Sequence, residues 1–107
     1  MIVIVFRSRP TPDVDEAAVG ALSQRMIEIA SSMPGFVSYK DFAAEDGEFV
    51  TLVEFESHET LAAWRNHPEH LEAQRRGREE FFAEYTIQVC EPVRAYTFDV
   101  AAGRRDL

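Results

Sequence analysis

The stretch from Trp64 to His70 holds the residues of this chain that are best suited to chemistry. It contains the only tryptophan, the only asparagine and two of the three histidines. Trp64 and His67 are three positions apart, as are His67 and His70, so on a helix each pair would share one face. Histidine titrates near neutral pH and serves as an acid or a base, and an indole can hold a flat substrate. We therefore take Trp64, His67 and His70 as candidate catalytic residues.

Each of these three residues also has a structural interpretation. Trp64 can belong to the core, where its indole N–H would need a partner. Pro68 disfavours a helical conformation at His67, so that residue can cap a new helix, while His70 can simply be solvated. Two histidines at this spacing could bind a metal, but the sequence fixes no third ligand. We expect no metal site.

The elements around this stretch are predicted from hydrophobic periodicity and from glycine and proline positions. Alternating or continuous apolar runs predict strands, and apolar residues at helical spacing predict helices. Asp46-Gly47 predicts a hairpin, Ser57 can cap the second helix, and Pro68 should break that helix. The strands are expected at residues 1–6, 36–42, 49–55 and 84–98, the last with a bulge at Glu91-Pro92, and the helices at 14–33 and 57–82.

The resulting order, βαββαβ, predicts an α+β, ferredoxin-like fold in which a four-stranded antiparallel sheet carries two helices on one face. One domain is expected over residues 1–100, followed by a short, loose C-terminal tail over 101–107. Every strand has apolar side chains on both faces. The open face of the sheet must therefore be covered, and we expect a homodimer whose two sheets face each other as a barrel.

Composition excludes several classes of partner. Eleven basic residues stand against 19 acidic ones among 107, a net charge of −8, which opposes binding to a phosphate backbone. No apolar run approaches the roughly 20 residues of a membrane span, and the apolar start is too short for a secretory signal. Cys90 is the only cysteine. We expect a cytoplasmic protein that binds neither nucleic acid nor membrane.

Several short motifs resemble those of one family. The Met33-Pro34-Gly35-Phe36 junction, the hairpin ending in Val53-Glu54-Phe55 and the Trp64-to-Ala73 helix with His67-Pro68-Glu69-His70 resemble the antibiotic biosynthesis monooxygenase domain of the dimeric α+β barrel superfamily. The resemblance covers residues 1–98. It implies a dimer, and a function among cofactor-independent oxygenases of polyphenols, haem-degrading enzymes and members of unassigned activity.

The haem-degrading branch is only partly matched. That branch combines an asparagine in the first strand with a helix tryptophan and, further along the helix, a histidine ligand to the haem. Trp64 matches the tryptophan, but Asn66 is the only asparagine and no histidine occurs near Gln74. The sequence therefore does not favour haem degradation.

The resemblance favours a monooxygenase that acts on an aromatic or quinol-like small molecule without a cofactor. Such an enzyme must hold a flat substrate away from water and stabilise its anion, so that the anion can reduce O₂. We expect Tyr39 and Phe82 to contact the substrate and Arg65, or alternatively Arg7, to balance its charge. The alternative function is a non-catalytic small-molecule-binding or stress-response protein of the same fold.

Overall fold

The computed structural model describes all 107 residues. Its order confirms the predicted βαββαβ arrangement, with the second helix divided into three consecutive pieces. The elements of this unit are β1 (Ile2–Pro10), α1 (Glu16–Ser32), β2 (Phe36–Ala43), β3 (Phe49–Phe55), α2 (His58–Arg65), α3 (Pro68–Arg76), the π-helical turn η1 (Gly77–Phe81) and β4 (Phe82–Cys90).

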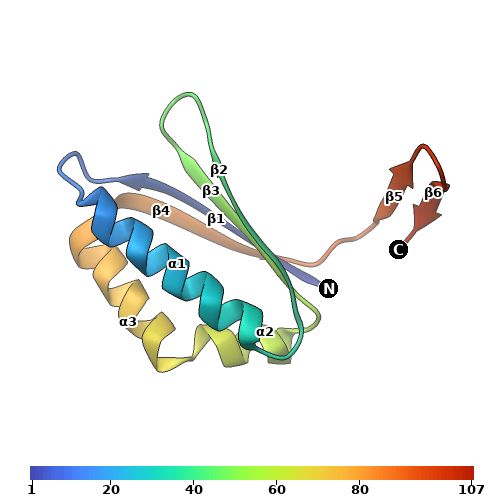
Figure 1. Cartoon of the computed structure of the whole chain (residues 1–107), viewed down its shortest axis with the longest axis horizontal. Coiled ribbons are helices and arrows are strands. Elements are labelled where there is room, and N and C mark those ends of the chain that lie inside the picture. Colours follow the sequence, from blue (N-terminus) through green and yellow to red (C-terminus); the bar gives the residue numbers. More distant parts are fainter.

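The four strands form one sheet in the order β2-β3-β1-β4, and neighbouring strands are antiparallel. The helices cover one face of this sheet (Figure 1). This is the predicted α+β, ferredoxin-like fold. No helix is both long enough and apolar enough to cross a membrane.

The core lies between the sheet and the helices. Ile2 and Ile4 of β1 pair with Phe55 and Val53 of β3, and all four side chains are buried. Apolar residues from the facing helices close the cluster, because α1 and α2 turn one apolar side to the sheet. The helical members of the core are Met26, Ile29, Ala30, Leu61 and Trp64.

Two local signals position the second helical segment. Gly35 has a φ of 79°, and a Cβ at this position would lie 2.5 Å from the Thr60 side chain in α2. Only glycine allows both that conformation and this close approach. Ser57 caps α2 as predicted, since its side chain accepts a hydrogen bond from the backbone N–H of Thr60. The predicted helix break is also confirmed, with Pro68 at the first position of α3.

The C-terminal prediction was wrong. Instead of one long bulged strand, β4 ends at Cys90, and the chain leaves the sheet at Glu91-Pro92. It then forms a separate two-stranded hairpin of β5 (Tyr96–Asp99) and β6 (Gly103–Asp106). The residues expected to be a loose tail thus supply a paired strand. We call residues 91–107 the arm; the domain boundary at residue 100 stays a prediction.

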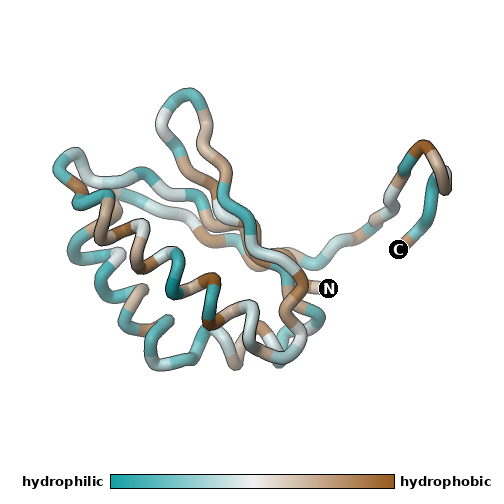
Figure 2. The backbone as a smooth tube through the Cα atoms, viewed as in Figure 1, coloured by the Kyte–Doolittle hydropathy of each residue, from teal (hydrophilic) through white to brown (hydrophobic).

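The second face of the sheet carries no helix (Figure 1). Val3 and Val5 alternate with the buried residues of β1 and lie on this face, where Val5 pairs with Leu52. Phe42 is on the same side of β2, beside Val50 of β3, and is 46% exposed. We call the helix-free face of the sheet the open face. The tube in Figure 2 shows hydrophobic stretches both in the sheet and at the turn of the arm.

Candidate active site

Trp64 belongs to the core, which was the structural one of the two interpretations of this residue. Its side chain is 5% exposed. The indole stacks on Phe55, with ring centroids 5.5 Å apart, and meets the ring of Tyr39 edge-on at 6.2 Å. Its Nε1 atom is buried and has no hydrogen-bond acceptor. A buried donor without a partner destabilises a fold by about 1–3 kcal/mol, so this N–H is an unfavourable feature of the core.

His70 lies directly against Trp64. Their ring centroids are 4.3 Å apart, with the planes at 64°. The side-chain amide of Gln74 donates a hydrogen bond to Nδ1 of His70 at 3.0 Å. Desolvation lowers the pKa of His70, and a backbone hydrogen bond to Arg65 partly offsets that effect. The imidazole is therefore held neutral beside the tryptophan.

His67 has a structural role at the start of α3. Its Nδ1 accepts a hydrogen bond from the backbone N–H of Glu69 at 3.1 Å, which makes it the N-cap of that helix. Because α2 ends at Arg65, Trp64 and His67 do not share one helix face, contrary to the spacing argument. The structure instead brings His70 to Trp64.

Glu69, next to His67, ties α3 to the first helix. The guanidinium of Arg25 in α1 donates to its carboxylate at 2.6 and 2.9 Å. This hydrogen bonding lowers the pKa of Glu69. The carboxylate is thus committed to holding the two helices together and is not a free base.

The residues expected to bind substrate fall into three different places. Tyr39 touches Trp64, and burial, with a smaller contribution from the charge of Asp41, raises its pKa. Phe82 instead packs against Phe6 in a separate aromatic group, with the two ring centroids 5.4 Å apart. Arg65 is exposed at the last position of α2.

Arg7, the alternative cation, lies on the open face. Its guanidinium binds the carboxylate of Glu48 at 2.9 Å. In β1 it alternates with Ser8, which is buried on the helix side of the sheet. Arg7 is therefore on the opposite side of the sheet from Trp64 and His70.

Arg78 is a cation that the sequence argument missed. Its Nε donates to the hydroxyl of Tyr85 at 2.8 Å, and no carboxylate lies within ion-pairing distance of its guanidinium. Arg78 follows His70 and Gln74 at intervals of four, so the three side chains succeed one another along α3 and η1. That spacing was visible in the sequence. We call Trp64, His70, Gln74 and Arg78 the donor row.

An exposed apolar strip of β4 lies on the same side of the sheet as the donor row. Tyr85 and Val89 pair with Ser8 and Ile4, whose side chains are buried under the helices. Yet the strip itself remains open: Tyr85, Ile87 and Val89 are 36%, 51% and 48% exposed. The Arg78–Tyr85 hydrogen bond joins the row to this strip. We call these three residues the β4 strip.

The exposed donor of the donor row is Arg78, whose guanidinium keeps N–H groups beyond the one that binds Tyr85. In both His67 and His70 the Nδ1 atom accepts from an N–H group, so the neutral ring carries its proton on Nε2. Arginine and the indole of tryptophan are donors only. Such a set, beside an apolar strip, suits a flat molecule that carries a carbonyl or phenolate oxygen. It offers no free imidazole lone pair as a general base.

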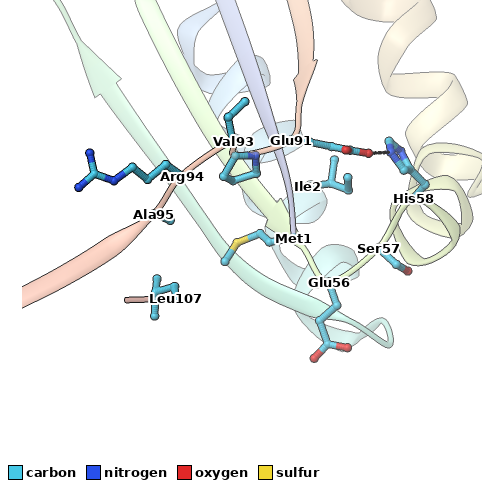
Figure 3. A pocket seen from close by; sticks show the side chains of 11 residues that line it. Met1, Ile2, Glu56, Ser57, His58, Glu91, Val93, Arg94, Ala95 and Leu107 are labelled. Atoms are coloured by element: carbon cyan, nitrogen blue, oxygen red, sulfur yellow. Dashed lines mark hydrogen bonds and ion pairs between the residues drawn. The ribbon is translucent and has the colours of Figure 1, made fainter. Parts of the chain in front are cut away.

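A hollow lies elsewhere, at the root of the arm (Figure 3). It has a volume of about 520 Å³ and contains none of the predicted site residues. Its most defined polar contact joins His58 Nε2 to Glu91 Oε1 at 2.5 Å. We place the candidate site at the donor row rather than here, because half of this hollow's wall is the arm itself. The side chains form no group of three or more His, Cys, Asp and Glu residues that could hold a metal ion.

Known proteins resemble this chain in both sequence and structure. The model of the antibiotic biosynthesis monooxygenase family matches residues 1–76. An uncharacterized protein of Bacillus subtilis, YqjZ, is 27% identical over 84 residues, which are 78% of this chain and 74% of that protein.

Solved structures share the fold over most of the chain. Rv0793 from Mycobacterium tuberculosis superimposes with a TM-score of 0.75 at 25% identity, over 94% of this chain and 98% of its own. A variant of SnoaB, a cofactor-independent oxygenase from Streptomyces nogalater, gives a TM-score of 0.74 at 14% identity, over 88% and 94%. Because the family model spans more than half of the sequence, this chain belongs to the antibiotic biosynthesis monooxygenase family.

Proposed function

We propose that this protein is a monooxygenase that oxidises a flat aromatic substrate of the quinol or phenol type with O₂. Membership of the family supports a monooxygenase-type role, and the resemblance to SnoaB supports a reaction without a cofactor. The observation that carries the substrate class is the donor row beside the β4 strip, joined by the Arg78–Tyr85 hydrogen bond. Hydrogen-bond donors beside an apolar strip favour an aromatic anion over a neutral aliphatic molecule.

The chemistry follows from stabilising that anion. The β4 strip would bind the aromatic rings, while Arg78 would lower the pKa of the acidic group of the substrate. Its proton would leave to solvent, since neither histidine presents a free lone pair. The electron-rich anion then reduces O₂; one oxygen atom enters the substrate and the other leaves as water. When a CH₂ group becomes a carbonyl, the substrate supplies all four electrons.

In this proposal the residues named from the sequence have unequal roles. His70 would contact the substrate, and Trp64, supported by Tyr39 from the core side, would hold the imidazole in place. Phe82 would contribute only through its own aromatic group near Tyr85, and His67 would cap α3. Arg65 is replaced by Arg78 as the residue that balances the charge.

Oxygen consumption with an anthrone or a naphthoquinol tests the proposal. Purified protein should exceed the buffer rate, and Arg78→Gln should lose most of this excess, whereas Arg65→Gln should retain it. Equal rates for the protein and a buffer blank across both substrate types would refute the oxygenase function.

One observation favours a second candidate function, the binding of a small molecule without turnover. Both histidines have Nδ1 engaged as an acceptor, so the site lacks an obvious base. Trp64 fluorescence distinguishes the two functions, because a ligand that quenches it without consuming O₂ identifies a binding protein.

We also propose that the chain is a cytoplasmic homodimer that uses the open face. The support is the set of apolar side chains on that face, among them Val3, Val5 and Leu52, which no helix covers. Exposed apolar patches of this kind mark interfaces. Sedimentation that shows a monomer at micromolar concentration would contradict the dimer.

A further inference from the structure

The helical segment before β4 ends in a turn of a rare type. In η1 the backbone N–H of Phe82 donates a hydrogen bond to the carbonyl of Gly77, five residues back. Single π-helical turns of this kind are uncommon and occur frequently at functional sites. Phe82 is also the first residue of β4, so no loop separates the turn from the strand. Arg78 on the turn and Tyr85 on the strand therefore meet directly.

The backbone of Gly77 does not require a glycine. Its φ and ψ are −57° and −48°, which any residue adopts in a helix. Glycine is also among the least favourable residues inside a helix. The position is instead crowded, because Gly77 is buried and a Cβ there would lie 2.9 Å from Cε2 and 3.0 Å from Cδ2 of Phe82. The missing side chain therefore leaves room for the Phe82 ring.

Two further aromatic rings hold the ring of Phe82. It meets Phe6 edge-on with the ring centroids 5.4 Å apart, and it meets Tyr85 edge-on at 6.1 Å. The rings of Phe6 and Tyr85 are themselves 5.4 Å apart. Edge-on aromatic contacts are favourable, so each of the three rings restricts the other two. A displaced Phe82 ring would therefore displace Tyr85.

The far end of the turn is anchored separately. Phe81 is 3% exposed, and the guanidinium of Arg76 lies 5.0 Å from the centre of its ring. The carbonyl of Phe81 accepts a hydrogen bond from the backbone N–H of Thr11 at 2.9 Å. These contacts tie the turn to the core and to the segment before α1. A side chain at residue 77 would therefore displace the Phe82 ring rather than the whole turn.

We propose that Gly77 and Phe82 are positioning residues for Arg78. Gly77 leaves room for the Phe82 ring, and that ring fixes the ring of Tyr85. The Tyr85 hydroxyl in turn accepts a hydrogen bond from Nε of Arg78 at 2.8 Å. This inference rests on the proposed function, because it concerns how the guanidinium is held beside the β4 strip.

A positioned guanidinium binds an anion more tightly than a mobile one. Arg78 is exposed, and a long side chain in solvent loses rotamer freedom when it binds a ligand. The contact with Tyr85 removes part of that freedom before the ligand arrives. It occupies only Nε, so both terminal nitrogens stay available, and a guanidinium suits planar anions such as carboxylates. The arrangement therefore favours a flat aromatic anion.

The binding of 2-naphthoate, a flat aromatic carboxylate, tests the positioning without requiring turnover. Gly77→Ala should weaken binding about tenfold in equilibrium dialysis, which is the contribution of one hydrogen bond to a charged group. In an Arg78→Gln background the same substitution should cause little further loss, because the displaced group is already absent. An equal loss in both backgrounds would show a general packing defect and overturn the proposal. No loss with Arg78 present, or no binding by the native protein, would also overturn it.

A second variant tests the crowding itself. Phe82→Leu removes the ring atoms that a Cβ at residue 77 would meet, so Gly77→Ala should weaken binding less in that background than in the native protein. An equal effect in the two backgrounds would refute the role of Phe82. Phe82→Leu alone adds no atoms and should also weaken binding, so the proposal stays testable if thermal unfolding shows that Gly77→Ala does not fold.

A matched control and one further measurement complete the experiment. Gly20→Ala, inside α1, places a Cβ where no atom lies within 4 Å and should leave naphthoate binding unchanged. Oxygen uptake with a naphthoquinol separates this inference from the proposed function. If the native protein consumes no O₂ but Gly77→Ala still weakens naphthoate binding through Arg78, then the oxygenase function is wrong and the positioning is confirmed.

Discussion

The imidazole of His70 meets the indole of Trp64 with their ring centroids 4.3 Å apart and their planes at 64°. This contact joins the core to the donor row, because Trp64 is a core residue while His70 is only partly buried. It also places a titratable ring against the only fluorescent indole of the chain. The ionisation of His70 can therefore be followed directly.

The fluorescence of Trp64 should fall on acidification with a midpoint below pH 6.5, the usual pKa of histidine. Desolvation lowers the pKa of His70, and the positive charges of His67 and Arg65 lower it further. A protonated imidazole quenches an indole in contact with it. His70→Gln should abolish the transition, and His67→Gln should leave it. A midpoint above 6.5 would contradict this environment.

The lowered pKa of His70 also makes the stability of the protein depend on pH. The pKa of His70 is lower in the folded protein than in the unfolded chain, so the unfolded chain takes up its proton first as the pH falls. The contribution of neutral His70 is complete above pH 6.5 and is lost between 6.5 and the folded-state pKa. Urea unfolding at several pH values should show this loss in the native protein and a smaller one in His70→Gln.

His67 should behave as a helix cap in mutagenesis. Removal of its Nδ1 acceptor in His67→Ala leaves the N–H of Glu69 without that partner, which should destabilise the protein by about 1 kcal/mol. His67→Asn restores a capping oxygen and should recover most of that loss. Substrate turnover should be retained in His67→Asn, and its disappearance there would instead assign His67 to the chemistry.

Trp64 gives a prediction about the buried N–H. Trp64→Ala should cost about 3–5 kcal/mol, as for other buried aromatic residues. Trp64→Phe should cost much less, since the loss of ring area is offset by removal of an unpaired donor, whose burial is unfavourable by about 1–3 kcal/mol. Trp64→Phe should also keep its affinity for a quinone, because the N–H is buried; a loss of affinity with unchanged stability would contradict this. Thermal unfolding and equilibrium dialysis measure the two effects.

Glycine substitutions test the packing that holds α2 in place. Gly35→Ala should destabilise the protein by more than about 1 kcal/mol, because the new Cβ would need a positive φ and would lie 2.5 Å from Thr60. Gly47 also has a positive φ but has open space around it, so Gly47→Ala should cost less. Gly20→Ala, inside α1 with no close neighbour, should stabilise the protein. Equal effects at Gly35 and Gly47 would show that the contact with Thr60 is unimportant.

The fold was predictable because local signals agree with one another. Pro34-Gly35, Asp46-Gly47, Ser57 and Pro68 mark turns and helix ends through backbone chemistry that acts within a few residues. The arm was not predictable in this way. Alternating residues after Pro92 fit a continued strand as well as a separate hairpin, and only the absence of pairing partners distinguishes them.

The candidate site was predictable only in part, because it depends on contacts between elements as well as on local signals. The spacing argument placed Trp64, His67 and His70 on one continuous helix. The helix breaks at Pro68, and His70 rather than His67 contacts Trp64. Arg78 depends on a contact with Tyr85, seven residues further along the chain and in another element. Periodicity places residues on a face of one element, but it does not specify contacts between elements.

Arg78 gives the sharpest functional prediction. Arg78→Gln should lower kcat/KM for an aromatic substrate by about 10- to 150-fold, since hydrogen bonds to a charged group contribute about 1.5–3 kcal/mol. Tyr85→Phe keeps the ring and removes only the hydroxyl to which Arg78 donates. If this hydroxyl positions the guanidinium, Tyr85→Phe should lose less kcat/KM than Arg78→Gln and retain its apolar contact with the substrate.

The matched control is Arg76→Gln, because Arg76 pairs with Glu80 at 2.9 Å and has no role in the donor row. If Arg76→Gln and Arg78→Gln lower the oxygen-uptake rate equally, then the general charge at the end of α3 and in η1, and not the Arg78 guanidinium, stabilises the anion.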